Sequence, residues 1–155
     1  MNHFHDWFYC REKIYVTAKQ AKAEVGQVSI LVNNPGIVSR KALLDTPDEK
    51  IIRTFNVNIM VHFWTIKAFL PDMISHKQDN LVNITSLAGH SCTNKLVDYC
   101  ASKFAAMGQE EELRVELFVQ GHVDYIKTTV VCPYFISTGM FAGVQVKIKS
   151  ILIPF

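Results

Sequence analysis

Three short apolar segments alternate with long stretches of helical periodicity, and this alternation most narrowly limits the possible folds. The segments lie at 28–32, 81–85 and 127–132 and contain several β-branched residues. Each is followed by asparagine, serine or proline, residues that favour turns. Strands that alternate with helices in this way form βαβ units with parallel strands. The sequence therefore predicts an α/β fold, and we expect the strand at 28–32 to be buried on both faces.

The first helix is expected upstream of these strands. Apolar residues recur at intervals of three and four from Arg11 to Val25, and Gly26 follows in the position of a helix C-cap. The first ten residues show no clear period. We expect a poorly determined lead-in there, with a strand remnant as the alternative.

The second helix is expected from Pro47 to about Leu70. Thr46 would be its N-cap, and Pro71 would kink or end it. A third helix is expected over residues 99–119. Asn58 interrupts the apolar stripe of the second helix. It is either a core residue bonded to a neighbouring loop or a functional polar group, because an asparagine inside a helix needs a partner.

Length and composition indicate one packed domain over residues 1–155. Hydrophobic residues make up 49% of the chain, and 16 basic and 14 acidic residues are interspersed to a net charge of +2. Because there is no basic tract, we expect no nucleic-acid binding. No apolar run reaches 18 residues, so no transmembrane segment is expected. The four cysteines form no Cys-x-x-Cys pair, so we expect reduced thiols, no metal site and a cytoplasmic chain.

A serine, a tyrosine and a lysine between Asn83 and Lys103 have the spacing of a catalytic group. Ser86 lies thirteen residues before Tyr99, and Lys103 follows Tyr99 by four, which places tyrosine and lysine on one helix face. A tyrosine hydroxyl titrates near about 10, and a close ammonium lowers that pKa. We therefore predict that Lys103 lowers the pKa of Tyr99, while Ser86 holds a substrate oxygen in line with it.

The tyrosine-lysine spacing is not specific by itself, because Tyr15 and Lys19 repeat it. No serine on a strand precedes that pair, so we interpret both as helix-surface residues. Ligands of open parallel sheets bind beyond the carboxyl ends of the strands. We expect residues 33–36, Ser86 and residues 133–138 to meet there.

Taken together, these residues resemble the short-chain dehydrogenase/reductase superfamily over about residues 11–140. Asn33-Asn34-Pro35-Gly36 is similar to the Asn-Asn-Ala-Gly motif of the family. The stretches VSILVNNPGIV and YCASKFAA look most like the 16C-like branch, which includes epidermal retinol and 17β-hydroxysteroid dehydrogenases. The resemblance implies a Rossmann-type doubly wound parallel sheet. It also implies oxidation of a hydrophobic, retinol- or steroid-like alcohol with NAD or NADP.

The resemblance also implies a role for each matching residue. Tyr99 would be the general acid/base, Lys103 would lower its pKa and hold the nicotinamide ribose, and Ser86 would orient the substrate oxygen. Asn58 would anchor a water in a proton relay. The expected cofactor-binding residues are Asn34, Gly36, Tyr99, Lys103, Pro133, Ile136 and Thr138.

The chain departs from the family pattern in several places. A complete member begins with a strand, a Gly-rich turn and a second strand that ends in the residue separating NAD from NADP. This sequence lacks these elements and the hydrophobic anchor of the branch, whose members resemble endoplasmic reticulum or lipid droplet proteins. We expect a partial sheet, an open apolar edge beside the 28–32 strand and a weakened cofactor site. Pro35 and Tyr134 replace alanine and glycine of the family pattern, and residues 141–155 do not match the expected substrate lid.

These departures leave an alternative to the enzyme. The chain could be a catalytically inactive, truncated fragment or an interaction protein. In that case helices 47–70 and 99–119 would form a homo- or hetero-dimer, because they correspond to the helices that pair many relatives.

Overall fold

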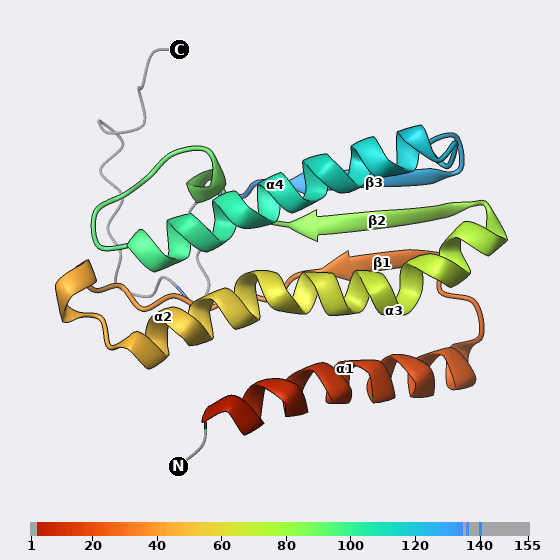
Figure 1. Ribbon diagram of the computed structural model, residues 1–155. Helices are drawn as coiled ribbons and strands as arrows, with labels where there is room; N and C mark the ends of the chain where they lie inside the picture. The colour runs from red at the N-terminus through yellow and green to blue at the C-terminus, as the bar shows by residue number, and fades with distance from the viewer. Residues whose placement is uncertain (1–2, 135, 137–139, 141–155) are drawn as a thin grey trace.

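A computed structural model describes the backbone of residues 3–134, 136 and 140, and the side chains of these residues from Arg11 onward (Figure 1). Three strands and four α-helices alternate along this part of the chain. A π-helical segment, η2, joins α2 to α3. Two short 3-10 turns complete the set: η1 precedes α2, and η3 follows β2. The elements are α1 His3–Val25, β1 Ile30–Asn33, η1 Leu43–Asp45, α2 Asp48–Phe55, η2 Asn56–Met60, α3 Val61–His76, β2 Asp79–Ile84, η3 Leu87–Gly89, α4 Val97–Val119 and β3 Ile126–Val131.

The three strands form one parallel sheet in the order β1-β2-β3, which confirms the predicted α/β fold. Asn33 pairs with Asn83 at the carboxyl end of β1, and Ile84 pairs with Val131 at the carboxyl end of β2. The strand ends that precede the predicted site residues therefore lie at the same edge of the sheet.

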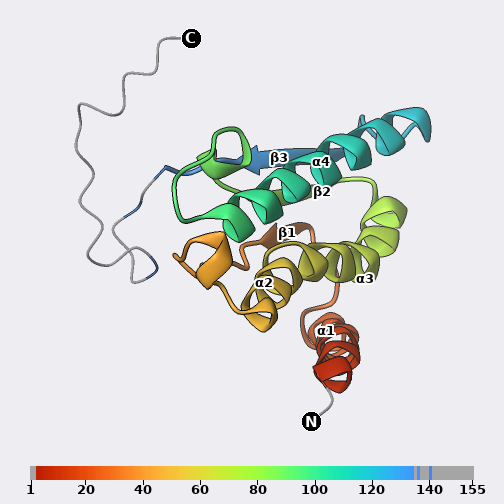
Figure 2. The same cartoon turned by 60° about the vertical axis from the view of Figure 1, so that its left-hand side comes forward.

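The helices α3 and α4 cover one face of this sheet, and α1 packs beside α3 (Figures 1 and 2). The core beneath them is centred on Met73, Leu117 and Ile126, with Leu31 of β1 packed against it. Each fully buried side chain of this size contributes about 1.5–3 kcal/mol through the hydrophobic effect. This core holds α3 and α4 against the sheet.

The prediction that the first strand is buried on both faces was wrong. Ile30 and Val32 are 58% and 54% exposed. They alternate with Leu31 and Asn33 and so lie on the face opposite the helices. Within the described residues no helix covers that face. β1 is an edge strand of the sheet, in agreement with the predicted open apolar edge beside residues 28–32.

The helix boundaries differ from the prediction in three places. The first helix begins at His3 instead of Arg11, because its interior contains no glycine or proline and adding turns to a formed helix costs less than nucleating one. Pro71 lies inside α3, which continues to His76. Burial of Met73 beyond the proline, at 1% exposed, offsets much of the cost of about 3 kcal/mol for a helical proline. Thr46 is not the N-cap of α2, because its hydroxyl donates to the Ala42 carbonyl at 2.8 Å instead of capping the helix. Pro47 takes the N-cap position.

Candidate active site

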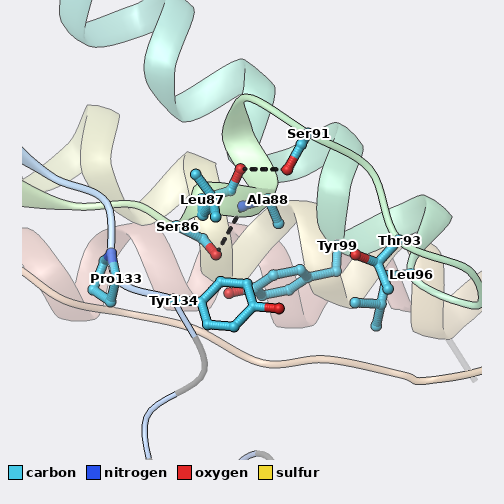
Figure 3. Close-up of a pocket in the computed structure, with 9 residues that line it drawn as sticks. All are labelled: Ser86, Leu87, Ala88, Ser91, Thr93, Leu96, Tyr99, Pro133 and Tyr134. Atoms are coloured by element: carbon cyan, nitrogen blue, oxygen red, sulfur yellow. Dashed lines mark hydrogen bonds between the residues drawn. The ribbon is translucent and has the colours of Figure 1, made fainter. Parts of the chain in front are cut away.

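Ser86 and Tyr99 line one small, partly open pocket (Figure 3). Ser86 follows β2 and caps η3, with its Oγ accepting a hydrogen bond from the Ala88 N–H at 3.1 Å. Tyr99 lies in the first turn of α4, and its hydroxyl is hydrogen-bonded to Ser86. The structure thus brings together two of the predicted catalytic residues. The pocket is lined by Ser86, Leu87, Ala88, Ser91, Thr93, Leu96, Tyr99, Pro133 and Tyr134.

The predicted lowering of the Tyr99 pKa is not found. Burial raises the pKa of Tyr99, and its hydrogen bond with Ser86 offsets only part of that increase. The Lys103 Nζ lies 5.9 Å from the centre of the Tyr99 ring. Because the tyrosine is only 4% exposed, the desolvation penalty on a phenolate outweighs the effect of the ammonium. Tyr99 is therefore held as a protonated phenol, the form that donates a proton.

Lys103 is buried where three segments of the chain meet. Its Nζ donates to the carbonyl of Ile84, the last residue of β2, at 3.3 Å, and burial lowers its pKa to about 8. A Cβ placed on Gly36 would lie 4.0 Å from the same Nζ, so the turn after β1 also approaches it. Ile84 supplies its one hydrogen-bond acceptor among the described residues. The two remaining N–H donors fit the hydroxyl groups of a ribose.

Asn58 lies in the π-helical segment and is completely buried. Its side-chain oxygen accepts from the Ile37 N–H at 2.8 Å, and its Nδ2 donates to the Ile37 carbonyl at 3.0 Å and to Ser102 Oγ at 2.9 Å. Ser102 Oγ in turn donates to the Tyr99 carbonyl at 2.7 Å. The side chain therefore ties the turn after β1 to α4, as expected for a residue bonded to a neighbouring loop. Both of its N–H groups are used, so they are not available to a relay water.

The remaining predicted site residues take different places. Pro133 lines the pocket, and its carbonyl accepts from the Leu87 N–H at 2.9 Å, which fixes the turn after Ser86. Asn34 is exposed at the end of β1 and Ile136 is 55% exposed. Thr138 lies outside the described residues.

Asn33, the first asparagine of the motif, belongs to a buried polar chain that links the strands to the helices. Its amide donates to Asn83 Oδ1 at 2.8 Å and accepts from Thr65 Oγ1 at 2.6 Å. Asn83 donates in turn to the Glu110 carboxyl group of α4, whose pKa is raised by burial. These bonds hold the carboxyl ends of β1 and β2 in place. They also satisfy the polar groups of Asn33, so this residue can be buried at the end of an apolar strand.

Two positioning features were missed by the sequence analysis. Asp98, next to Tyr99, is buried and accepts hydrogen bonds from Ser39 Oγ at 2.7 Å and Thr54 Oγ1 at 2.9 Å. Gly89 packs η3 onto α4, since an added Cβ would lie only 2.9 Å from the Lys103 carbonyl oxygen. The position of Asp98 directly before the tyrosine was a usable signal, whereas the close contact of Gly89 is visible only in three dimensions.

None of the helices in the described part of the chain is long and apolar enough to cross a membrane. The same part contains no cluster of three or more His, Cys, Asp or Glu side chains suited to a metal ion.

Comparison with known proteins agrees with this arrangement. Residues 10–148 match the short chain dehydrogenase family. Human epidermal retinol dehydrogenase 2 is 54% identical over 142 residues, which are 92% of this chain and 46% of that protein. Short-chain dehydrogenase/reductase family 16C member 6 of Bos taurus is 51% identical over 92% of this chain and 45% of its own length. Retinol dehydrogenase 10 of Rattus norvegicus is 49% identical over 88% of this chain and 40% of its own. The chain thus spans less than half the length of these relatives.

Solved structures show the same fold over most of the chain. A short chain dehydrogenase/reductase from Burkholderia phymatum in complex with NAD superposes with a TM-score of 0.79 and 27% identity, covering 84% of this chain and 47% of that one. A short-chain dehydrogenase from Streptomyces avermitilis gives a TM-score of 0.76 and 28% identity over 84% of this chain and 47% of its own. The chain therefore belongs to the short-chain dehydrogenase/reductase family, in the branch of the 16C members and the epidermal retinol dehydrogenases.

Proposed function

We propose that this chain carries the proton-transfer site of a nicotinamide-dependent oxidoreductase that acts on hydrophobic alcohols of the retinol or steroid type. The observation that carries the proposal is the hydrogen bond between the Ser86 and Tyr99 hydroxyls inside one pocket, next to a buried Lys103. The family membership and the names of the retinol dehydrogenase relatives support the same reaction class.

Each polar group has one task in this proposal. The Tyr99 hydroxyl gives a proton to the substrate oxygen during reduction and accepts it during oxidation. Ser86 holds that oxygen by a second hydrogen bond, and Lys103 places its free N–H donors against the ribose of NAD or NADP. The bound nicotinamide would supply or accept the hydride. Because the pKa of Tyr99 is raised, we expect alcohol oxidation to accelerate as pH increases above neutrality.

Asn58 has a positioning role in this proposal, with its amide fixed on Ile37 and Ser102. A relay water near Asn58 would bind backbone carbonyl groups of the π-helical segment. There the regular hydrogen-bond spacing is broken, as the Val61 N–H bonds the Asn56 carbonyl five residues back.

The pocket wall favours an apolar substrate. Leu87, Leu96 and Pro133 line it, and Tyr134 adds an aromatic ring near Tyr99 (Figure 3). Apolar walls with a few placed hydroxyls are typical of sites for hydrophobic small molecules.

The test uses the purified chain with all-trans-retinol and either NAD or NADP. We expect aldehyde formation that falls at least about 100-fold in Tyr99→Phe, because proton transfer contributes factors of about 10²–10⁴. Tyr15→Phe is the matched control, since Tyr15 has a lysine at the same spacing but no serine partner, and it should leave the rate unchanged. Absence of turnover together with absence of cofactor binding by calorimetry would refute the activity.

A second function is favoured by an apolar groove between α3 and α4. We propose that two copies of the chain pair through it. Phe63, which is 40% exposed, lines the groove together with charged residues of both signs that could pair across a twofold axis. The groove is lined by Phe63, Ile66, Lys67, Leu70, Pro71, Ile74, Gln109, Glu112, Leu113 and Glu116.

Light scattering after size exclusion tests this pairing. We expect a dimer that Phe63→Lys converts to a monomer. Leu44→Lys, which changes an apolar residue that is 98% exposed outside the groove, should leave the dimer intact. A monomeric parent chain at micromolar concentration would contradict the proposal, and co-purification with a longer relative would identify a hetero-dimer instead.

A further inference from the structure

Two cysteines flank the catalytic tyrosine and contact each other. Cys100 directly follows Tyr99 in α4, and Cys92 lies in the loop between η3 and α4. The Cys100 thiol is hydrogen-bonded to the Cys92 thiol and to the backbone of Thr93. Two consecutive loop residues, Cys92 through its side chain and Thr93 through its backbone, thus contact the Cys100 sulfur.

The two thiols differ in accessibility. Both are free, with Cys92 exposed and Cys100 only 3% exposed. A dissolved oxidant therefore reaches Cys92 first, while Cys100 is placed to attack the product from inside the protein. Burial raises the pKa of the Cys100 thiol, which also favours Cys92 as the sulfur that reacts first.

We infer that Cys92 and Cys100 form a reversible intrachain disulfide that fastens the loop to the catalytic helix. The oxidant is a small disulfide such as oxidised glutathione. The Cys92 thiolate attacks one glutathione sulfur, forms a mixed disulfide and releases one glutathione thiolate. Cys100 then attacks the Cys92 sulfur, which forms the protein disulfide and releases the second glutathione. Two protein thiols are oxidised, one glutathione disulfide is reduced to two thiols, and the two thiol protons pass to the released glutathiones.

This disulfide would act on the wall of the active-site pocket. Thr93 and Leu96, which lie between the two cysteines in sequence, line the same pocket as Tyr99 (Figure 3). A bond between Cys92 and Cys100 closes a short loop over this wall and restricts its movement. The dithiol is therefore a modification site whose state changes access to Tyr99, and its existence does not depend on the proposed activity.

Cys132 is the natural control. Cys132 contacts Thr85 Oγ1 at 3.1 Å and His90 Nε2 at 3.6 Å, so it has different neighbours from the pair. The folded chain with all four cysteines is incubated with oxidised glutathione, blocked with N-ethylmaleimide and digested for mass spectrometry. We expect a peptide that joins Cys92 to Cys100, loss of two hydrogen atoms from the intact mass, and complete reversal by dithiothreitol. Cys132→Ser should keep this product, and Cys92→Ser should lose it.

Several outcomes would overturn the inference. They are stable glutathione adducts on Cys92 without the internal bond, disulfides that involve Cys132 instead, dimers linked through Cys92, or no oxidation. The eight-residue separation alone favours this pair in an unfolded chain, so the same experiment in urea gives the baseline rate. The folded chain should form the Cys92–Cys100 product faster than the chain in urea, and an equal rate would show that the native contact contributes nothing. Mass mapping requires no turnover, so failure of the dithiol and failure of the proposed enzyme activity are distinguishable. If the chain does turn over, oxidation should change the KM of the parent chain and should leave the KM of Cys92→Ser unchanged.

Discussion

The buried amide of Asn58 gives the sharpest prediction about what holds the site together. Asn58→Ala removes the three hydrogen bonds to the Ile37 N–H, the Ile37 carbonyl and Ser102 Oγ. A net value of about 0.5–1.5 kcal/mol per bond gives about 1.5–4.5 kcal/mol in total. Ile37 is only partly buried, so water can satisfy its backbone groups in the variant, and we expect about 3 kcal/mol.

Asn58→Asp keeps the shape of the side chain but replaces its two N–H donors with an acceptor. A carboxylate oxygen would then face the Ile37 carbonyl, which accepts from Nδ2 at 3.0 Å in the native chain. Two acceptors at that distance repel, so the new carboxyl group is expected to have a raised pKa in the folded state. The sign follows from linkage: the destabilisation is complete above the folded pKa and is relieved as pH falls through it.

Urea unfolding followed by circular dichroism measures both variants. With a slope of about 2 kcal/mol/M, Asn58→Ala should lower the midpoint by about 1.5 M. Asn56→Ala is the matched control in the same π-helical segment, because Asn56 makes no side-chain hydrogen bond among the described residues. A loss below about 1 kcal/mol for Asn58→Ala would refute the reasoning, since a single average hydrogen bond is worth that much. So would an equal loss in the control.

The remaining predictions concern stability. Gly89→Ala should cost about 1–3 kcal/mol in thermal unfolding, because the new Cβ would lie 2.9 Å from the Lys103 carbonyl, whereas Gly108→Ala, with no atom within 4 Å, should be neutral or stabilising. Burial and Lys103 lower the pKa of His62 to about 4, so stability should fall by about 2 kcal/mol from pH 7 to pH 5 as the unfolded chain gains the proton. His62→Gln should flatten this dependence in urea unfolding, and an unchanged slope would contradict it. Asp79 is 1% exposed, and its carboxylate has no hydrogen-bond partner among the described residues. Such a group is expected to destabilise the fold, so Asp79→Ala should raise the melting temperature.

The sheet and the grouping of the site were predictable because they depend on local patterns. Apolar runs of strand length identified β2 and β3, and β-strand ends in a parallel sheet necessarily share an edge. A separation of four residues on a helix placed Lys103 beside Tyr99. Burial of β1 was not predictable in the same way. An apolar run is compatible with either one or two covered faces, and the covering elements are set by the rest of the fold.

The properties of individual side chains were less accessible to the sequence. The partners of Asn58 lie 21 and 44 residues away, and nothing in the residues 56–60 signals a π-helix. The sign of the Tyr99 pKa shift also depended on burial, which the spacing of tyrosine and lysine does not determine. Local spacing therefore indicates which groups meet, whereas their protonation requires the packing around them.

Lys103 lowers the stability of the folded chain but offers hydrogen-bond donors to a ligand. The residue is 3% exposed, its ammonium has one hydrogen-bond acceptor among the described residues at 3.3 Å, and its pKa is about 8 in place of 10.5. That difference corresponds to about 3 kcal/mol against the charged form in the folded chain. A buried ammonium with a single acceptor in the described part of the chain costs stability that a methionine would not cost. Its remaining donors are what a ribose hydroxyl would accept from, so binding there recovers part of the penalty. The residue is thus poorly compensated in the chain alone and well suited to holding a ligand.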